Sequence, residues 1–179
     1  MNIPMQNSNY FLDGLVVSVN TERIKNGMNP LEWSLPLMAL AAVKTRDMSM
    51  DDYPYMNESS SRPHISPRLG SPLDQARAAD YRYYPLELAA RGTDSVEATM
   101  NAWLKSPSHR VWITDPNFAK DLTHIGVGYY YNPASRYKHY WVLIMANQSQ
   151  EYPKDREDPY ERLPQLVHSP RRMRRKKSR

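Results

Sequence analysis

The chain has 179 residues, no cysteine and a formal net charge of +5 at pH 7. This length allows one domain of about 100–150 residues with a sizeable core, and the lack of cysteine excludes a disulfide framework, thiolate catalysis and a Cys-based zinc site. No apolar run approaches the ~20 residues that a membrane-spanning helix needs, and the N-terminal stretch lacks the positive and apolar regions of a signal peptide.

The first third of the chain predicts two helices after a polar N-terminal arm, residues 1–11. The first helix is expected over residues 11–26 and ends at Gly27, and the second begins after Ser34. The residues that share one helical face are Leu12, Leu15, Val16 and Val19 in the first helix and Leu37, Leu40, Ala41 and Lys44 in the second.

Residues 51–70 lose the helical pattern, and their serines and prolines predict a long loop that carries His64. Loops of this length are often functional in compact domains. The Ser-Pro pair at Ser71 predicts the start of a short helix. Residues 83–91 then form a short apolar segment with one carboxylate, Glu87.

An amphipathic helix is expected over residues 95–105, capped by Asp94. Its apolar face consists of Val96, Met100, Trp103 and Leu104. The Ser-Pro pair at Ser106 ends this helix, because the residue before a proline is pushed out of the α region. The same pair can start a short new turn, which would carry His109.

Two strands are expected near the end of the domain. Residues 125–131 alternate between apolar and small or aromatic side chains, and residues 139–146 are nearly all apolar. The second strand is therefore expected to be central and covered on both faces. With helices first and an antiparallel hairpin last, the order of elements indicates α+β layers.

Seven of the last nine residues are cationic: Arg171, Arg172, Arg174, Arg175, Lys176, Lys177 and Arg179. Removing them changes the formal charge from +5 to −2. Such a cluster can bind nucleic acid by counterion release, hold an anionic lipid surface by charge or serve as a localisation signal. A solvated tail without a dedicated partner is the alternative. We expect residues 148–179 to form a charged, largely disordered tail.

The motifs, taken in order, resemble the bacterial branch of the CAP superfamily, whose members contain an SCP-like domain. The resemblance spans about Leu12 to Ala146. It is carried by N-x-x-R and G-x-x-P-L-x-W at the start, an H-x-S-P loop, a glutamate segment, W-x-x-S-P-x-H-R and a final strand pair. The residues concerned are Asn20, Arg23, Gly27, Pro30, Leu31, Trp33, His64, Ser66, Pro67, Gly70, Glu87, Ala89, Trp103, Ser106, Pro107, His109, Arg110, Gly126, Gly128, Tyr140 and Trp141.

The resemblance implies a three-layer α-β-α sandwich with a small antiparallel sheet over residues 12–147. It also implies a surface cleft with two histidines and a carboxylate, which by position are His64, Glu87 and His109. A second carboxylate of the eukaryotic branch falls at Ser106 and is absent. By the same resemblance the protein would be secreted or lie at the cell surface.

Two positions near the implied cleft depart from the family pattern. Leu88 and Trp112 stand where family members have asparagine, so both amides are replaced by apolar groups. The polar network that these asparagines support in family members is therefore not expected here in the same form.

Two imidazoles and a carboxylate form a chemically sensible zinc-binding set with an open position for water. A metal-bound water or a His–Glu pair can also support hydrolysis, in which case Glu87 and His109 would be the catalytic residues. The alternative is structural: His109 bonds a backbone carbonyl at a helix end, and His64 lies on a mobile loop. His124 and His139, on or beside strands, are expected to be structural.

Two groups of tyrosines leave a similar choice open. Tyr83 and Tyr84, and the group from Tyr129 to Tyr131, either line a groove for a lipid, glycan or peptide or pack on the sheet with their hydroxyls in water.

We therefore expect a non-enzymatic binding module whose His/Glu cleft takes a divalent metal, with zinc as the candidate, or a small, lipid or peptide ligand. Two alternatives stay open. One is a metal-assisted hydrolase that uses the same cleft. The other is an assembly protein that its basic tail tethers to nucleic acid or to a partner.

Overall fold

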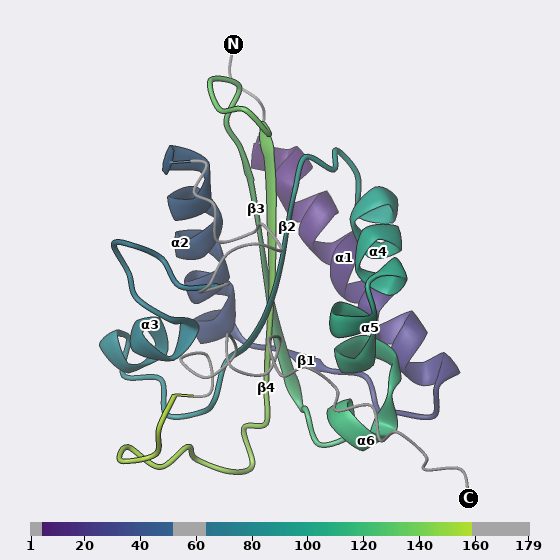
Figure 1. The fold of residues 1–179 in the computed structure, drawn as a ribbon. Helices are drawn as coiled ribbons and strands as arrows, with labels where there is room; N and C mark the ends of the chain where they lie inside the picture. Colours follow the sequence, from purple (N-terminus) through teal and green to yellow (C-terminus); the bar gives the residue numbers. More distant parts are fainter. Residues whose placement is uncertain (1–4, 52–63, 159–179) are drawn as a thin grey trace, which may run out of the picture.

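The computed structural model describes residues 5–51 and 64–158. A four-stranded sheet lies between two helical layers, with α2 and α3 on one side and α1, α4, α5 and α6 on the other (Figure 1). The helices are α1 (Met5–Lys25), α2 (Leu35–Asp51), α3 (Pro72–Ala78), α4 (Val96–Lys105), α5 (Pro107–Thr114) and α6 (Pro116–Ala119). The strands are β1 (Glu32–Trp33), β2 (Leu86–Arg91), β3 (His124–Tyr131) and β4 (His139–Ala146). The α+β class and the layered arrangement are as predicted.

The sheet has the strand order β1-β3-β4-β2. The hairpin of β3 and β4 is antiparallel as expected, and β2 adds antiparallel to the other edge of β4. The short β1 pairs parallel with β3, so the sheet is mixed rather than purely antiparallel. The sequence pattern of β2 predicts only a short apolar segment, so the structure adds this strand to the predicted pair.

Strand β4 explains why the core has two halves. Trp141, Leu143 and Met145 belong to the half that packs on α1 and α4. Tyr140, Val142 and Ile144 belong to the half that packs on α2. Because successive side chains of a strand point to opposite faces, an apolar strand of this kind must be covered on both sides.

Helix α2 lies very close to β3, because two positions of the strand carry no side chain. A Cβ atom at Gly128 would lie 2.5 Å from the carbonyl oxygen of Ala41, and one at Gly126 would meet the backbone of Leu37. Contacts this short are not found for real Cβ atoms. The two glycines therefore set the distance between the helix and the sheet.

Some predicted boundaries were wrong. Helix α1 begins at Met5, inside the predicted N-terminal arm of residues 1–11. The N-cap of α4 is Ser95 rather than Asp94, and the Ser95 hydroxyl accepts from the Ala98 amide at 3.2 Å. Both differences concern only the start of a helix, and the helices themselves lie where the hydrophobic periodicity predicts them.

The chain also stays on the domain beyond residue 147, where the tail was expected to begin. Residues 148–158 run back over α3, and the amide of Tyr152 donates to the carbonyl of Arg82 at 2.8 Å. The buried carboxylate of Asp158 accepts from the hydroxyl of Ser71, the N-cap of α3. Within the described residues, no helix is both long enough and apolar enough to cross a membrane.

Candidate functional site

Glu87 is a buried carboxylate on β2. The residue is 5% exposed and pairs across the sheet with Ile144 of β4. Ile144 belongs to the half of the core that α2 covers, so the Glu87 side chain lies in the layer between the sheet and α2. A charge buried this deeply needs a partner of opposite sign or a set of hydrogen bonds.

The partner is Lys44 of α2, whose side chain is fully buried. Its ammonium lies 3.8 Å from Oε1 of Glu87 and donates to the backbone carbonyl of His64 at 2.7 Å. No sequence motif marks Lys44 as a site residue. A signal was present, because Lys44 stands on the otherwise apolar face of the second helix, and a lysine in such a position marks a buried cation with a partner.

His64 is held from two directions. Its Nδ1 lies 2.9 Å from Oε1 of Glu87, and its carbonyl accepts from the Lys44 ammonium. The backbone of His64 has φ +72°, in the left-handed region that costs free energy for a residue with a side chain. The two bonds hold this conformation and fix the orientation of the imidazole.

The loop that follows His64 is fastened to the same helix one turn later. The Ser66 hydroxyl donates to Oδ2 of Asp47 at 2.7 Å, and Nε of Arg68 donates to Oδ1 of Asp47 at 2.8 Å. Asp47 is buried, and it lies three residues after Lys44. Helix α2 thus positions His64 and the loop that follows it.

The pKa of the Glu87 carboxyl ends below its ordinary value of 4.5. Burial alone would raise it, but the charge of Lys44 and the hydrogen bond and charge of His64 outweigh burial. Glu87 is therefore an ionised carboxylate at neutral pH. The buried pair with Lys44 has no net charge.

His109 lies in the first turn of α5, which begins at Pro107 after Ser106, as the Ser-Pro pair predicted. Its Nδ1 forms a hydrogen bond of 2.8 Å with Oγ of Ser106, not with a backbone carbonyl. Burial, and then the charge of His64, lower the pKa of His109 to about 4. The imidazole is therefore neutral at physiological pH.

The structure thus brings the three predicted site residues into one region. His64 and Glu87 are in direct contact, and His109 is near enough to His64 for their charges to interact. We call Lys44, His64, Glu87 and His109 together the His–Glu cluster. The structural alternatives for His64 and His109, a loose loop and a bond to a backbone carbonyl, do not describe the contacts found.

The cluster does not fit a three-ligand metal centre in this conformation. Across residues 5–51 and 64–158, no group of three or more His, Asp and Glu side chains is arranged to hold a metal ion. Glu87 Oε1 already faces the His64 ring and the Lys44 ammonium, and a fixed cation beside a carboxylate repels a divalent metal. The expectation that zinc binds at His64, Glu87 and His109 stays a prediction.

The low pKa of His109 predicts how stability depends on pH. The unfolded chain takes up this proton near pH 6.5 and the folded chain near pH 4, so stability falls as the pH drops through that window. We expect this group to lower the free energy of unfolding by about 1–3 kcal/mol between pH 7 and pH 4. The range allows for the partial exposure of the residue, because solvent screening reduces the effect of the pKa difference. Urea unfolding at several pH values measures it.

A matched variant separates His109 from the other titrating groups. His109→Gln should flatten the curve between pH 6.5 and pH 4, because the titrating ring is gone. Parallel curves for the wild type and His109→Gln would contradict the assignment.

The other predicted residues have separate places. His124 bonds the Thr123 hydroxyl through Nδ1 at 2.8 Å, and His139 bonds the Tyr129 hydroxyl at 2.9 Å, which fits their structural reading. The Tyr129 ring packs on Trp141, with centroids 4.4 Å apart. A cavity of about 520 Å³ lies elsewhere, beside α3, and Tyr83 is in its wall.

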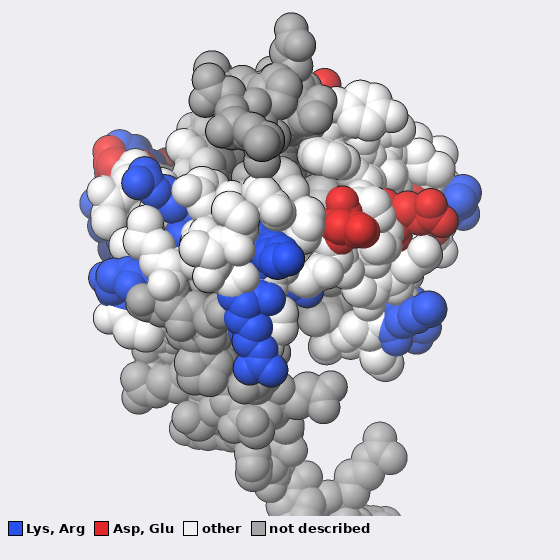
Figure 2. Space-filling model, turned by 90° about the horizontal axis from the view of Figure 1, so that it is seen from above, with Lys and Arg blue, Asp and Glu red and all other residues white. Residues whose placement is uncertain are grey.

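The seven cationic residues from Arg171 to Arg179 lie outside the described residues, so binding of a polyanion stays a prediction. Figure 2 shows one end of the molecule, where Lys and Arg side chains are scattered among uncharged residues of the described part of this face. That face therefore adds no extended basic surface to the argument for a polyanion.

A family model described as "Cysteine-rich secretory protein family", abbreviated CAP, matches residues 17–145. Among curated proteins, the uncharacterized protein YkwD of Bacillus subtilis is 36% identical over 116 residues, which cover 64% of this chain and 40% of that protein. The uncharacterized membrane protein YlbC of the same organism is 29% identical over 111 residues, 61% of this chain and 28% of that protein. The chain thus matches less than half the length of these relatives.

Solved structures share the fold at low sequence identity. An extracellular protein with an SCP domain from Bacillus anthracis superposes with a TM-score of 0.63 at 20% identity, covering 79% of this chain and 41% of that one. A cysteine-rich secretory protein from Staphylococcus aureus gives 0.58 at 16% identity, with 81% and 41% covered. An outer surface protein from Borrelia burgdorferi gives 0.58 at 18% identity, with 74% and 89% covered.

Proposed function

Because the chain belongs to the cysteine-rich secretory protein (CAP) family, we propose that it is a non-enzymatic binding module whose ligand meets the His–Glu cluster. The observation that carries the proposal is the buried Lys44–Glu87 pair, which holds His64 by both its ring and its carbonyl. A binding group that is fixed before the ligand arrives loses less entropy on binding.

The charge of the cluster favours an uncharged polar ligand. Lys44 and Glu87 cancel, and His109 is neutral at physiological pH. A neutral imidazole carries one hydrogen-bond donor and one acceptor. Such a ring can form hydrogen bonds with the amide or hydroxyl groups of a ligand. Our first candidate ligand is therefore a short peptide in an extended conformation.

Two features argue against catalysis by Glu87. The carboxylate is almost fully buried, and the Lys44 ammonium keeps its pKa low, so it is a poor general base. One observation favours a hydrolase as the second candidate, namely the 2.8 Å hydrogen bond between Ser106 Oγ and His109 Nδ1. A hydroxyl beside a neutral imidazole is a pairing found in nucleophilic catalysis.

The test follows the imidazole ring signals of ¹⁵N-labelled protein by NMR. Three probes are added separately: an uncharged acetylated and amidated tripeptide, oleate and zinc chloride. We expect the tripeptide to shift the His64 and His109 signals together in a saturable way. His109→Ala should weaken this binding by about tenfold or more, and His124→Ala should leave it unchanged.

The three probes decide between the readings of the cluster. If zinc shifts the signals of both rings and the tripeptide shifts neither, the ligand is a metal ion rather than a peptide. If none of the probes moves either ring, the cluster is a structural element and the proposal fails. Hydrolysis of a peptide or ester substrate that Ser106→Ala abolishes would overturn the non-enzymatic part.

A tethered assembly protein is the third reading. It depends on the seven cationic residues near the C-terminus, from Arg171 to Arg179. A tail that binds nucleic acid would act independently of the His–Glu cluster, so this reading and the binding module can hold together.

A further inference from the structure

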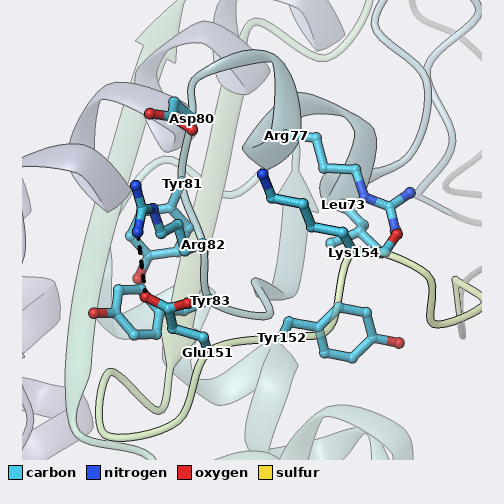
Figure 3. Close-up of a pocket in the computed structure, with 9 residues that line it drawn as sticks. All are labelled: Leu73, Arg77, Asp80, Tyr81, Arg82, Tyr83, Glu151, Tyr152 and Lys154. Atoms are coloured by element: carbon cyan, nitrogen blue, oxygen red, sulfur yellow. Dashed lines mark hydrogen bonds and ion pairs between the residues drawn. The ribbon is translucent and has the colours of Figure 1, made fainter.

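The cavity beside α3 is a second candidate site, and Figure 3 shows its walls. Its volume of about 520 Å³ lies within the range of pockets that hold small molecules. The residues that line it are Leu73, Arg77, Asp80, Tyr81, Arg82, Tyr83, Glu151, Tyr152 and Lys154. None of them belongs to the His–Glu cluster.

The cavity is preformed, because hydrogen bonds fasten both of its walls. One wall is the end of α3 and the turn after it, and the other is the segment of residues 151–154. The amide of Tyr152 donates to the carbonyl of Arg82 at 2.8 Å, and Nη2 of Arg77 donates to the carbonyl of Lys154 at 3.2 Å. The opening between the walls therefore does not have to form when a ligand binds.

Three tyrosines supply flat surfaces and hydroxyl groups. Tyr81 and Tyr83 stand edge to face with centroids 5.3 Å apart, and Tyr152 lies on the other wall (Figure 3). The Tyr152 ring also packs on Tyr84, with centroids 5.0 Å apart. The Tyr81 hydroxyl accepts from Nε2 of Gln148 at 2.9 Å, and burial raises its pKa to about 12, so the phenol is neutral. Aromatic faces with polar tips suit a ligand with a ring of its own.

The charges of the cavity leave a positive excess. Arg82 and Glu151 pair with each other at 3.6 Å on the exposed rim. Arg77 donates to neutral backbone carbonyls, which do not cancel its charge, and Asp80 is the remaining carboxylate. The Lys154 ammonium extends between the two walls toward Tyr81 (Figure 3).

We propose that this cavity binds a small anion that carries a ring, with the carboxylate or phosphate at Lys154 and the ring against the tyrosines that line the walls. An ammonium that meets an anion in a partly enclosed space forms a charge-assisted hydrogen bond, which is stronger than a neutral one. The aromatic walls add contact area that a bare anion does not use. The proposal is independent of the ligand at the His–Glu cluster.

The experiment titrates the ¹⁵N-labelled full chain with matched probes and follows backbone amide signals. Glucuronate, glucose 6-phosphate and 4-hydroxybenzoate each combine a ring with an anion. Glucose has the ring without the charge, and acetate has the charge without the ring. We expect saturable shifts around Tyr83, Tyr152 and Lys154 with a ring-bearing anion, and binding about tenfold weaker or undetectable with glucose and acetate.

Comparison among the three ring-bearing anions identifies the source of the ligand, a sugar acid, a sugar phosphate or an aromatic acid. Lys154→Met removes the charge but keeps most of the stem, and Tyr152→Leu removes the ring. Each should weaken binding of the best probe by about tenfold, while Lys105→Met, which removes an exposed lysine of α4, should not.

Thermal unfolding checks that the variants are folded. Equal binding of glucose and glucuronate, or unchanged binding by Lys154→Met, would overturn the role of the charge. No saturable shift with any ring-bearing anion would overturn the site. His109→Ala should leave binding at this cavity unchanged, so failure here and failure of the proposed function are distinguishable.

Discussion

Replacement of Lys44 by methionine should lower the free energy of unfolding by about 3–5 kcal/mol. Methionine fills a similar volume but takes away the ammonium that faces the buried carboxylate of Glu87 and the carbonyl of His64. The carboxylate then stays in the interior without its cation. Urea unfolding at pH 7.5 measures the loss.

An exposed ion pair of the same protein supplies the control. Lys25 and Glu22 lie 2.8 Å apart on the surface of α1, and the Lys25 side chain is 62% exposed. Surface pairs contribute only about 0–1 kcal/mol, so Lys25→Met should have a small effect. Equal losses for Lys44→Met and Lys25→Met would show that Lys44 is not the counter-charge of Glu87.

The pH dependence of the Lys44→Met loss identifies its cause. Without the ammonium, burial raises the pKa of Glu87, so the carboxyl takes up a proton as the pH falls. A neutral carboxyl no longer needs the cation, and the difference from the wild type should shrink between pH 7.5 and pH 5. In the double variant Lys44→Met/Glu87→Gln, the combined loss should be smaller than the sum of the single losses by about 1–3 kcal/mol.

Three of the four residues of the His–Glu cluster could be predicted from the sequence, and the role of the fourth could not. His64, Glu87 and His109 stand in recognisable motifs, and the structure brings them into one region. Lys44 has no motif, and its role depends on the distance between α2 and β2, two elements far apart in the chain. Periodicity put Lys44 on a buried face but could not say which group it meets there.

Strand β2 and the ordered segment of residues 148–158 could not be predicted from the sequence for a related reason. The sequence of β2, Leu86–Arg91, has no alternation because the strand is buried on both faces, and short apolar runs do not distinguish strand from helix. The polar composition of residues 148–158 indicated disorder, but a few placed contacts, such as those of Tyr152 and Asp158, fasten the segment to α3. Composition does not report individual contacts of this kind.

Gly128→Ala should destabilise the protein by about 1–3 kcal/mol or more, because the added methyl group meets backbone rather than a side chain that can turn away. The new Cβ would lie 2.5 Å from the Ala41 carbonyl oxygen and 2.9 Å from the Ala42 nitrogen, both in α2. Relief requires the whole helix to move outward from β3. Thermal and urea unfolding measure the loss.

Gly14→Ala is the matched control, with the same chemical change at a position that has room. There the Cβ would lie 3.6 Å from the Val96 side chain, an ordinary contact. Since alanine favours a helix over glycine by about 1 kcal/mol, this variant should be as stable as the wild type or more stable.

If Gly128→Ala lowers the stability of the protein and Gly14→Ala raises it, β3 needs glycine at residue 128 for α2 to pack so closely. The same displacement of α2 by Gly128→Ala should also carry Lys44 away from Glu87 and disturb the His64 ring signal. A Gly128→Ala protein as stable as Gly14→Ala would mean that α2 adjusts freely, and its distance from the sheet would then not determine the geometry of the His–Glu cluster.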